Sequence, residues 1–198
     1  MLRILKATAL AAILAAVYSA PAAAHMGLGG HGGFAHGFMH PVGGLDHVLA
    51  MAAVGMLAAH LGGRALWLVP TAFAAMMAAG GLLGFAGAPL PFVEPGIGLS
   101  VIALGLLVAL RVHIPTVLAM AIAGLFAVFH GHAHGTELPM GSAPAAFAAG
   151  FVIATALLHG AGIVLGLGLD RLARTSRNWA TRAVGGLMAL SGVSLLAQ

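Results

Sequence analysis

The sequence predicts an all-α integral membrane protein: a bundle of six transmembrane helices after a cleavable signal peptide, with the N- and C-termini outside. Of the 198 residues, 61% are hydrophobic and only 6% are charged, whereas about 25% are charged in an ordinary soluble domain. Beyond the N-terminal segment, six apolar runs each approach the roughly 20 residues that a helix needs to cross a bilayer. A third observation, the distribution of arginines, predicts the orientation.

Residues 1–24 have the features of a secretory signal peptide. Arg3 and Lys6 precede a short apolar stretch, and the segment closes on the small residues PAAA, which is the pattern of a signal-peptide cleavage site. We therefore expect cleavage after Ala24. The alternative is an uncleaved first transmembrane helix, which the short apolar stretch and the break at Pro21 disfavour.

Residues 25–41 are expected to form an outer segment that is rich in histidine and glycine. Cleavage would leave His25 as the first residue, and its α-amine and imidazole together would offer a bidentate chelate to a metal ion. With His31 and His36 it would make a capture arm. The alternative is a flexible, glycine-rich tether.

The rest of the chain, residues 42–198, is expected to be one six-helix transmembrane domain. Its spans are separated by short connections such as GGR, GAPLP and ELPMGSAP, whose glycines and prolines interrupt helices. Glycine and alanine are frequent inside the spans, where small side chains allow helix backbones to pack closely in lipid. The predicted spans are 43–61, 65–85, 96–112, 114–130, 145–167 and 180–197.

The arginines predict the orientation of these spans. If the mature N-terminus is outside, every basic residue beyond the signal peptide falls in a cytoplasmic connection and the outer connections have none, as the positive-inside rule requires. Both termini are then outside, and a multi-pass location in the inner (cytoplasmic) membrane of a bacterium is expected. The residues concerned are Arg64, Arg111, Arg171, Arg174, Arg177 and Arg182.

Three ionisable residues stand at the start of the first span, in the stretch HPVGGLDHVLAM. An aspartate inside a span costs about 2.5 to 3.5 kcal/mol on insertion scales, so Asp46 and His47 are expected to be functional. Pro41 suits the first turn of a helix, and along such a helix His40 and His47 share a face after two turns. The alternative is an Asp–His pair that only fixes helix packing.

A second group of ionisable residues, FHGHAHGTE, stands where the fourth span ends. If the segment is helical, His130 and His134 share a face and Glu137 follows one turn later. His132 lies between them and is a further candidate ligand. The two glycines of the stretch can end the helix here, so the alternative is a solvated loop that is rich in histidine.

The two groups are expected to lie together at the outer side, because the first span begins there and the fourth ends there. Imidazole with carboxylate suits nickel, cobalt, zinc or copper, and the absence of cysteine argues against a thiolate site for soft ions. His159, near the middle of the fifth span, would either pass an ion inward or form a hydrogen bond between helices.

Both motifs resemble those of a known family. The order of a histidine, five residues and then Asp-His resembles the first-span motif of the HupE/UreJ family of nickel permeases, and FHGHAHGTE resembles its second motif, in which His132 occupies a variable place. A signal peptide followed by six spans is also similar, so the resemblance covers essentially the whole chain. It implies a secondary transporter that imports nickel, or cobalt. The metal ligands expected on both grounds are His40, Asp46, His47, His130, His134 and Glu137.

We therefore expect a permease rather than an enzyme, with a divalent metal ion as substrate, no resident cofactor and no nucleic-acid partner. The chain has no phosphate-binding loop, so the membrane potential is the expected driving force. Because ligand histidines must be neutral, uptake is expected to fall as the pH drops through about 6.5. Two alternatives stay open: an intramembrane zinc-dependent hydrolase, and a metal-binding membrane partner that transports nothing.

Overall fold

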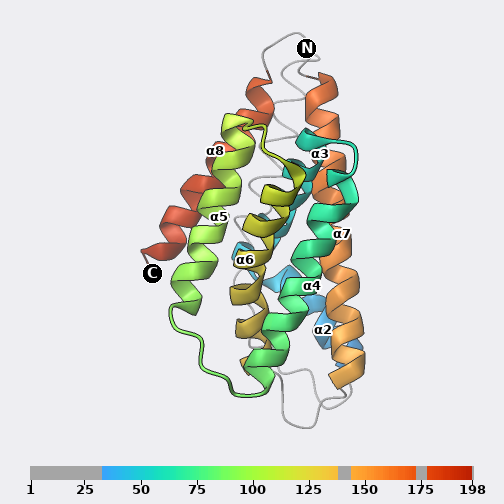
Figure 1. Ribbon diagram of the computed structural model, residues 1–198, viewed down its shortest axis with the longest axis vertical. Helices are drawn as coiled ribbons and strands as arrows, with labels where there is room; N and C mark the ends of the chain where they lie inside the picture. The colour runs from blue at the N-terminus through green and yellow to red at the C-terminus, as the bar shows by residue number, and fades with distance from the viewer. Residues whose placement is uncertain (1–32, 138–143, 173–177, 198) are drawn as a thin grey trace. The chain divides into compact units, whose positions relative to one another are not determined.

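The structure is helical throughout the part of the chain that it describes (Figure 1). The computed structural model describes residues 33–137, 144–172 and 178–197. The predicted signal peptide, residues 1–24, and His25 lie outside the described residues. The helices are α2 (Gly33–Gly43), α3 (Leu45–Leu61), α4 (Ala65–Phe85), α5 (Val93–Leu110), α6 (Thr116–Thr136), α7 (Pro144–Leu172) and α8 (Trp179–Leu196).

Five of these helices, α4 to α8, are long and apolar enough to cross a membrane. Helices α2 and α3 make a sixth candidate if they count as one broken span, with an angle of 79° between the two parts. The prediction of an all-helical membrane protein is therefore confirmed, with five or six candidate spans among the described residues. The signal peptide and the placement of the termini stay predictions.

The start of the first span differs from the prediction. Pro41, expected in the first turn of that span, lies inside the last turn of α2, and α3 begins only at Leu45. Between the two helices Gly44 is extended, with φ −93° and ψ 119°. A Cβ atom on Gly44 would lie 2.7 Å from Asp46 Oδ1. A glycine here therefore lets the chain turn sharply and bring the Asp46 carboxylate back over the bend.

Helix α2 includes part of the predicted outer segment. Residues 33–41 are helical instead of forming a glycine-rich tether, because α2 packs closely against α7. A Cβ on Gly37 would collide with the backbone carbonyl of Phe147, and one on Gly150 would collide with that of Phe34. Two glycines thus allow the two backbones to touch.

Helix α6 continues past its predicted end at His130 and reaches Thr136. The glycines that predicted a break are instead the points at which α6 meets α4. A Cβ on Gly131 would collide with the carbonyl oxygen of Met77, and one on Gly135 with that of Gly81. Close backbone packing offsets the low helix propensity of glycine, and the second histidine motif is helical throughout.

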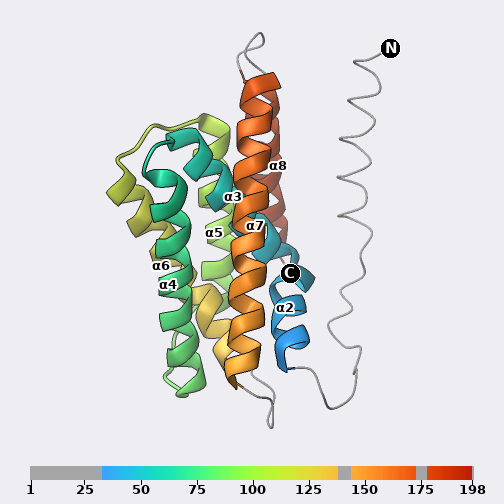
Figure 2. The same cartoon turned by 90° about the vertical axis from the view of Figure 1, so that its right-hand side faces the viewer.

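The helices of the described bundle pack in pairs around α3. Helix α4 lies along α6, α5 lies along α8, and α7 contacts both α2 and α3, as Figure 2 shows for α7 and α3. Helix α3 also contacts α4, α5 and α6, and most of its residues are buried. This central place brings the start of α3 beside the end of α6, which positions the site described next.

Candidate metal site

Helix α6 presents three ionisable side chains along one face at its C-terminal end. His130, His134 and Glu137 are separated by four and three residues, so each lies one helical turn from the next. His130 is fully buried and His134 is 7% exposed, while Glu137 is exposed. The face therefore leads from the surface into the bundle.

The imidazoles of α2 and α3 pack against this face. The His47 ring lies 4.5 Å from that of His130 and 4.2 Å from that of His134, measured between ring centroids. The His40 ring lies 4.5 Å from that of His134, and His40 Nε2 lies 3.2 Å from Glu137 Oε2. The structure thus brings the two sequence motifs into direct contact, and we call His40, His47, His130 and His134 the histidine cluster.

Part of this cluster already has the dimensions of a metal site. One ligand atom from each of His40, His134 and Glu137 lies within 4.8 Å of the other two. Nitrogen and oxygen ligands bind first-row divalent ions at about 2.0 to 2.2 Å. An ion placed between these donors would therefore need only small side-chain adjustments.

Asp46 is bonded directly to His47 and orients its ring. Its Oδ1 atom lies 2.9 Å from His47 Nδ1 and also accepts the backbone N–H of His47 at 2.9 Å. A carboxylate oxygen only accepts, so Nδ1 carries the proton and Nε2 keeps its lone pair. This carboxylate–histidine pairing is the usual support of a metal-binding histidine.

Ser100 orients His130 as Asp46 orients His47. Ser100 was not among the residues predicted from the sequence. The Ser100 hydroxyl donates to the carbonyl of Ile97 at 2.6 Å. Because a hydroxyl has one proton, its oxygen accepts the Nε2–H of His130 at 2.7 Å, which leaves Nδ1 with the lone pair. A lone serine in an apolar run was the only available signal, since a buried hydroxyl requires a partner.

Several ring nitrogens of the histidine cluster, which take no part in the bonds to Asp46 and Ser100, have no hydrogen-bond partner among the described residues. They are buried and comprise His47 Nε2, His130 Nδ1 and both ring nitrogens of His134. Leaving a buried polar group unpaired costs about 1 to 3 kcal/mol, so such groups call for an explanation. A metal ion bound by the lone pairs would supply it.

Aromatic rings from α7 and α4 line the cluster. Phe151 lies 4.5 Å from the His134 ring and Phe147 lies 5.8 Å from the His40 ring, both between centroids. Phe73 of α4 lies 5.8 Å from the deepest imidazole, that of His130. These rings keep the imidazoles in a low-dielectric setting, in which charged ligands act more strongly.

The charges around this end of the bundle favour a cation. Asp46 and Glu94 line a neighbouring cavity of about 310 Å³ between α3, α5 and α8, and Glu137 lies at the outer edge of the cluster. The arginines of the described residues belong to helix ends or connections on the far side of the bundle. Because the charged residues described near the cluster are acids, its electrostatic potential attracts positive ions.

Two further predicted ligands lie apart from the cluster. His132 is on another face of α6, and its Nε2–H donates to the carbonyl of Ala88 at 2.8 Å, so this ring ties α6 to the end of α4. His159 of α7 is buried beyond Phe73, at 5.2 Å between ring centroids. Its Nε2 is buried and has no hydrogen-bond partner among the described residues.

Comparison with known proteins gives one consistent result. The family model described as HupE / UreJ protein matches residues 12–195. Protein HupE of Rhizobium leguminosarum bv. viciae is 50% identical over 174 residues, which cover 87% of this chain and 88% of that protein. No solved structure matches.

Proposed function

Since this chain belongs to the HupE/UreJ family, which is associated with nickel uptake, we propose that it is a permease that imports nickel, or cobalt, through the histidine cluster. The observation that carries the proposal is the set of buried imidazole nitrogens without partners, at His47, His130 and His134. Imidazole and carboxylate donors without thiolate suit nickel, cobalt, zinc and copper. The family match favours nickel within this group.

The proposed path follows the ionisable face of α6 inward. The ion first meets His40 and Glu137 at the surface, passes to His134 and His47 one turn deeper, and then reaches His130. Each step is about one helical turn, or 5.4 Å. Successive sites with shared ligands let an ion move without being fully released into an apolar region, and they keep binding weak enough for exit.

Phe73 is the proposed barrier between this path and the inner half of the protein. Its ring is fully buried and contacts both His130 and His159. An ion leaving His130 has to pass this ring to reach His159, which is then the next available nitrogen donor. Apolar constrictions of this kind close a pathway to water and hydrated ions until they move.

The proposed direction of transport is inward, from an outer cluster to a cytoplasmic end that carries the arginines. The positive-inside rule supports this orientation. A membrane potential contributes about 2.3 kcal/mol per charge for each 100 mV, so a divalent ion gains roughly 4.6 kcal/mol on entering. The potential alone is therefore a sufficient driving force, and no nucleotide is required.

Metal uptake into proteoliposomes with an imposed potential tests the proposal. Nickel, cobalt, zinc and copper are compared for the wild type, His134→Ala and the matched control His113→Ala, which removes an exposed imidazole at the opposite end. We expect nickel accumulation that His134→Ala abolishes and His113→Ala retains. Absence of flux for all four metals, or equal flux in all three proteins, would refute it.

The same assay separates the proposal from the two other candidate functions. A zinc-dependent hydrolase would retain stoichiometric zinc through purification and show no flux. A metal-binding partner without transport activity would bind nickel but would not accumulate it inside the vesicles.

A further inference from the structure

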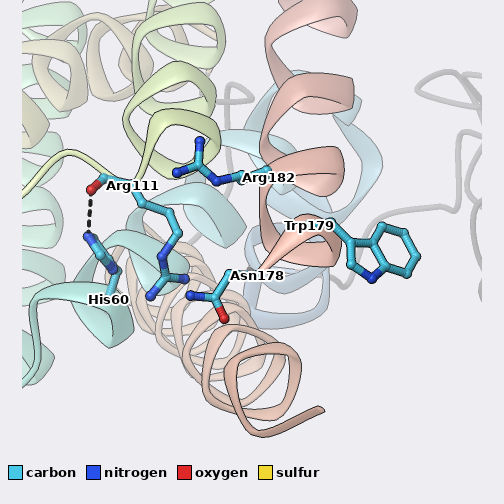
Figure 3. Close-up of a pocket in the computed structure, with 5 residues that line it drawn as sticks. All are labelled: His60, Arg111, Asn178, Trp179 and Arg182. Carbon is cyan, nitrogen blue, oxygen red and sulfur yellow. Dashed lines mark hydrogen bonds between the residues drawn. The ribbon is translucent and has the colours of Figure 1, made fainter. Parts of the chain in front are cut away.

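An open pocket of about 590 Å³ lies at the end of the bundle opposite the histidine cluster. His47 and His60 stand near the two ends of α3, and their separation of 13 positions corresponds to about 20 Å along the helix. The pocket is therefore separate from the histidine cluster. It is lined by His60, Arg111, Asn178, Trp179 and Arg182 (Figure 3).

Arg111 is held in place on one side of the pocket. Its Nη1 and Nη2 atoms donate to the two carboxylate oxygens of Asp170 at 2.5 and 3.1 Å, and the hydroxyl of Thr181 donates to Asp170 at 3.1 Å. The carbonyl of Arg111 accepts the Nε2–H of His60 at 3.1 Å. The bidentate pair uses two of the five guanidinium N–H groups and leaves the others for a ligand.

Arg182 supplies a second positive charge, which has no carboxylate within ion-pair distance among the described residues. Its side chain extends from α8 toward the segment of Arg111, as Figure 3 shows. None of the described residues that line the pocket is a carboxylate, and nearby Asp170 is paired with Arg111. Its charge therefore selects anions.

The start of α8 adds polar donors to the same pocket. Asn178, the residue before the helix, adopts a left-handed conformation with φ 56° and makes no capping bond through its side chain. The first N–H groups of a helix lack partners within it, and they carry the positive end of the helix dipole. The combination of these groups with two arginines is suited to phosphate oxygens.

Trp179 places this pocket at a membrane surface. It is 59% exposed, and its indole points away from the other four labelled residues (Figure 3). Tryptophans of membrane proteins are enriched at the level of the lipid headgroups, and basic pockets between transmembrane helices bind anionic headgroups on the cytoplasmic side. We propose that the pocket binds a phosphate group, supplied either by an anionic phospholipid or by free phosphate.

The test measures binding directly and does not depend on metal transport. Native mass spectrometry quantifies retained lipid in protein released from nanodiscs of phosphatidylcholine with or without phosphatidylglycerol. A parallel arm measures the thermal stability of lipid-free, detergent-solubilised protein with added inorganic phosphate. Wild type, Arg182→Gln and the control Arg64→Gln are compared, because Arg64 lies at the same end of the bundle but outside the pocket.

We expect the wild type and Arg64→Gln to retain phosphatidylglycerol over phosphatidylcholine and Arg182→Gln to retain it about fivefold less, from about 1 kcal/mol per basic residue. Protection by inorganic phosphate that is lost only in Arg182→Gln would also support the site and identify free phosphate as a source. Equal retention in all three proteins together with no phosphate effect would overturn the proposal. An equal loss in Arg64→Gln and Arg182→Gln would also overturn it, since it would indicate general attraction to the membrane.

Discussion

Replacing Ser100 by alanine should weaken metal binding while the bundle stays folded. Ser100 and His130 are both fully buried, and the Ser100 oxygen accepts the Nε2–H of His130 at 2.7 Å. When Nδ1 binds a metal ion, the proton has to remain on Nε2. Without the hydroxyl, the metal-bound form therefore holds an unpaired N–H, whereas the metal-free imidazole can change its tautomer or turn.

The size of the effect follows from the cost of that unpaired group. A buried donor without a partner costs about 1 to 3 kcal/mol, and 1.4 kcal/mol corresponds to a factor of ten in affinity. The Ser100→Ala variant should therefore bind nickel about 5- to 140-fold more weakly. This range agrees with the 10- to 100-fold losses that are typical when a group supporting a metal ligand is removed.

Calorimetric titration of the detergent-solubilised protein with nickel measures this loss, and the thermal midpoint reports folding. Ser194→Ala is the matched control, because it removes the same hydroxyl from an exposed position on α8. In a His130→Ala background, Ser100→Ala should cause no additional loss, since the two residues act as one unit. Unchanged affinity in Ser100→Ala, or an equal loss in the His130→Ala background, would refute the reasoning.

Three further predictions follow from other parts of the structure. Asp46→Asn should reduce nickel uptake about tenfold because it weakens the orientation of a ligand imidazole. Glu94→Gln should cause a smaller loss, and this loss should disappear at high salt. Equal losses in the two variants at all salt concentrations would contradict this prediction. Phe73→Leu should raise the rate of nickel uptake by widening the proposed barrier, and an unchanged rate would exclude the barrier. Gly131→Ala should lower the thermal midpoint because its methyl group would meet the α4 backbone. The control Gly186→Ala should leave the midpoint unchanged or raise it slightly, since nothing lies within 4 Å of the added atom. Similar midpoints in the two variants would argue against close α4–α6 packing.

The sequence was sufficient to predict the helical membrane fold and the contact between the two histidine motifs. Apolar run lengths identify spans because backbone hydrogen bonds in lipid have to be satisfied within a helix. The alternation of span direction then places the start of the first span beside the end of the fourth. Spacing by three and four residues also predicted which side chains of α6 share a face, so His130 and His134 were expected together.

Other features depend on packing that no local pattern encodes. Gly131 has low intrinsic helix propensity, and only the α4 backbone against it explains why the helix continues. Pro41 is acceptable in the first turn of a helix, yet α2 forms before it because Gly37 and Gly150 allow contact with α7. Ser100 could not be assigned to His130 from spacing, since the two residues lie on different helices.

The most direct test of the central claim is the X-ray absorption spectrum of nickel bound to the purified protein. If the histidine cluster is the transport site, the spectrum should show imidazole nitrogen and carboxylate oxygen ligands, without sulfur. The imidazole contribution should fall in His134→Ala and stay unchanged in His113→Ala. A spectrum without imidazole ligands, or one that is identical in the two variants, would contradict the account.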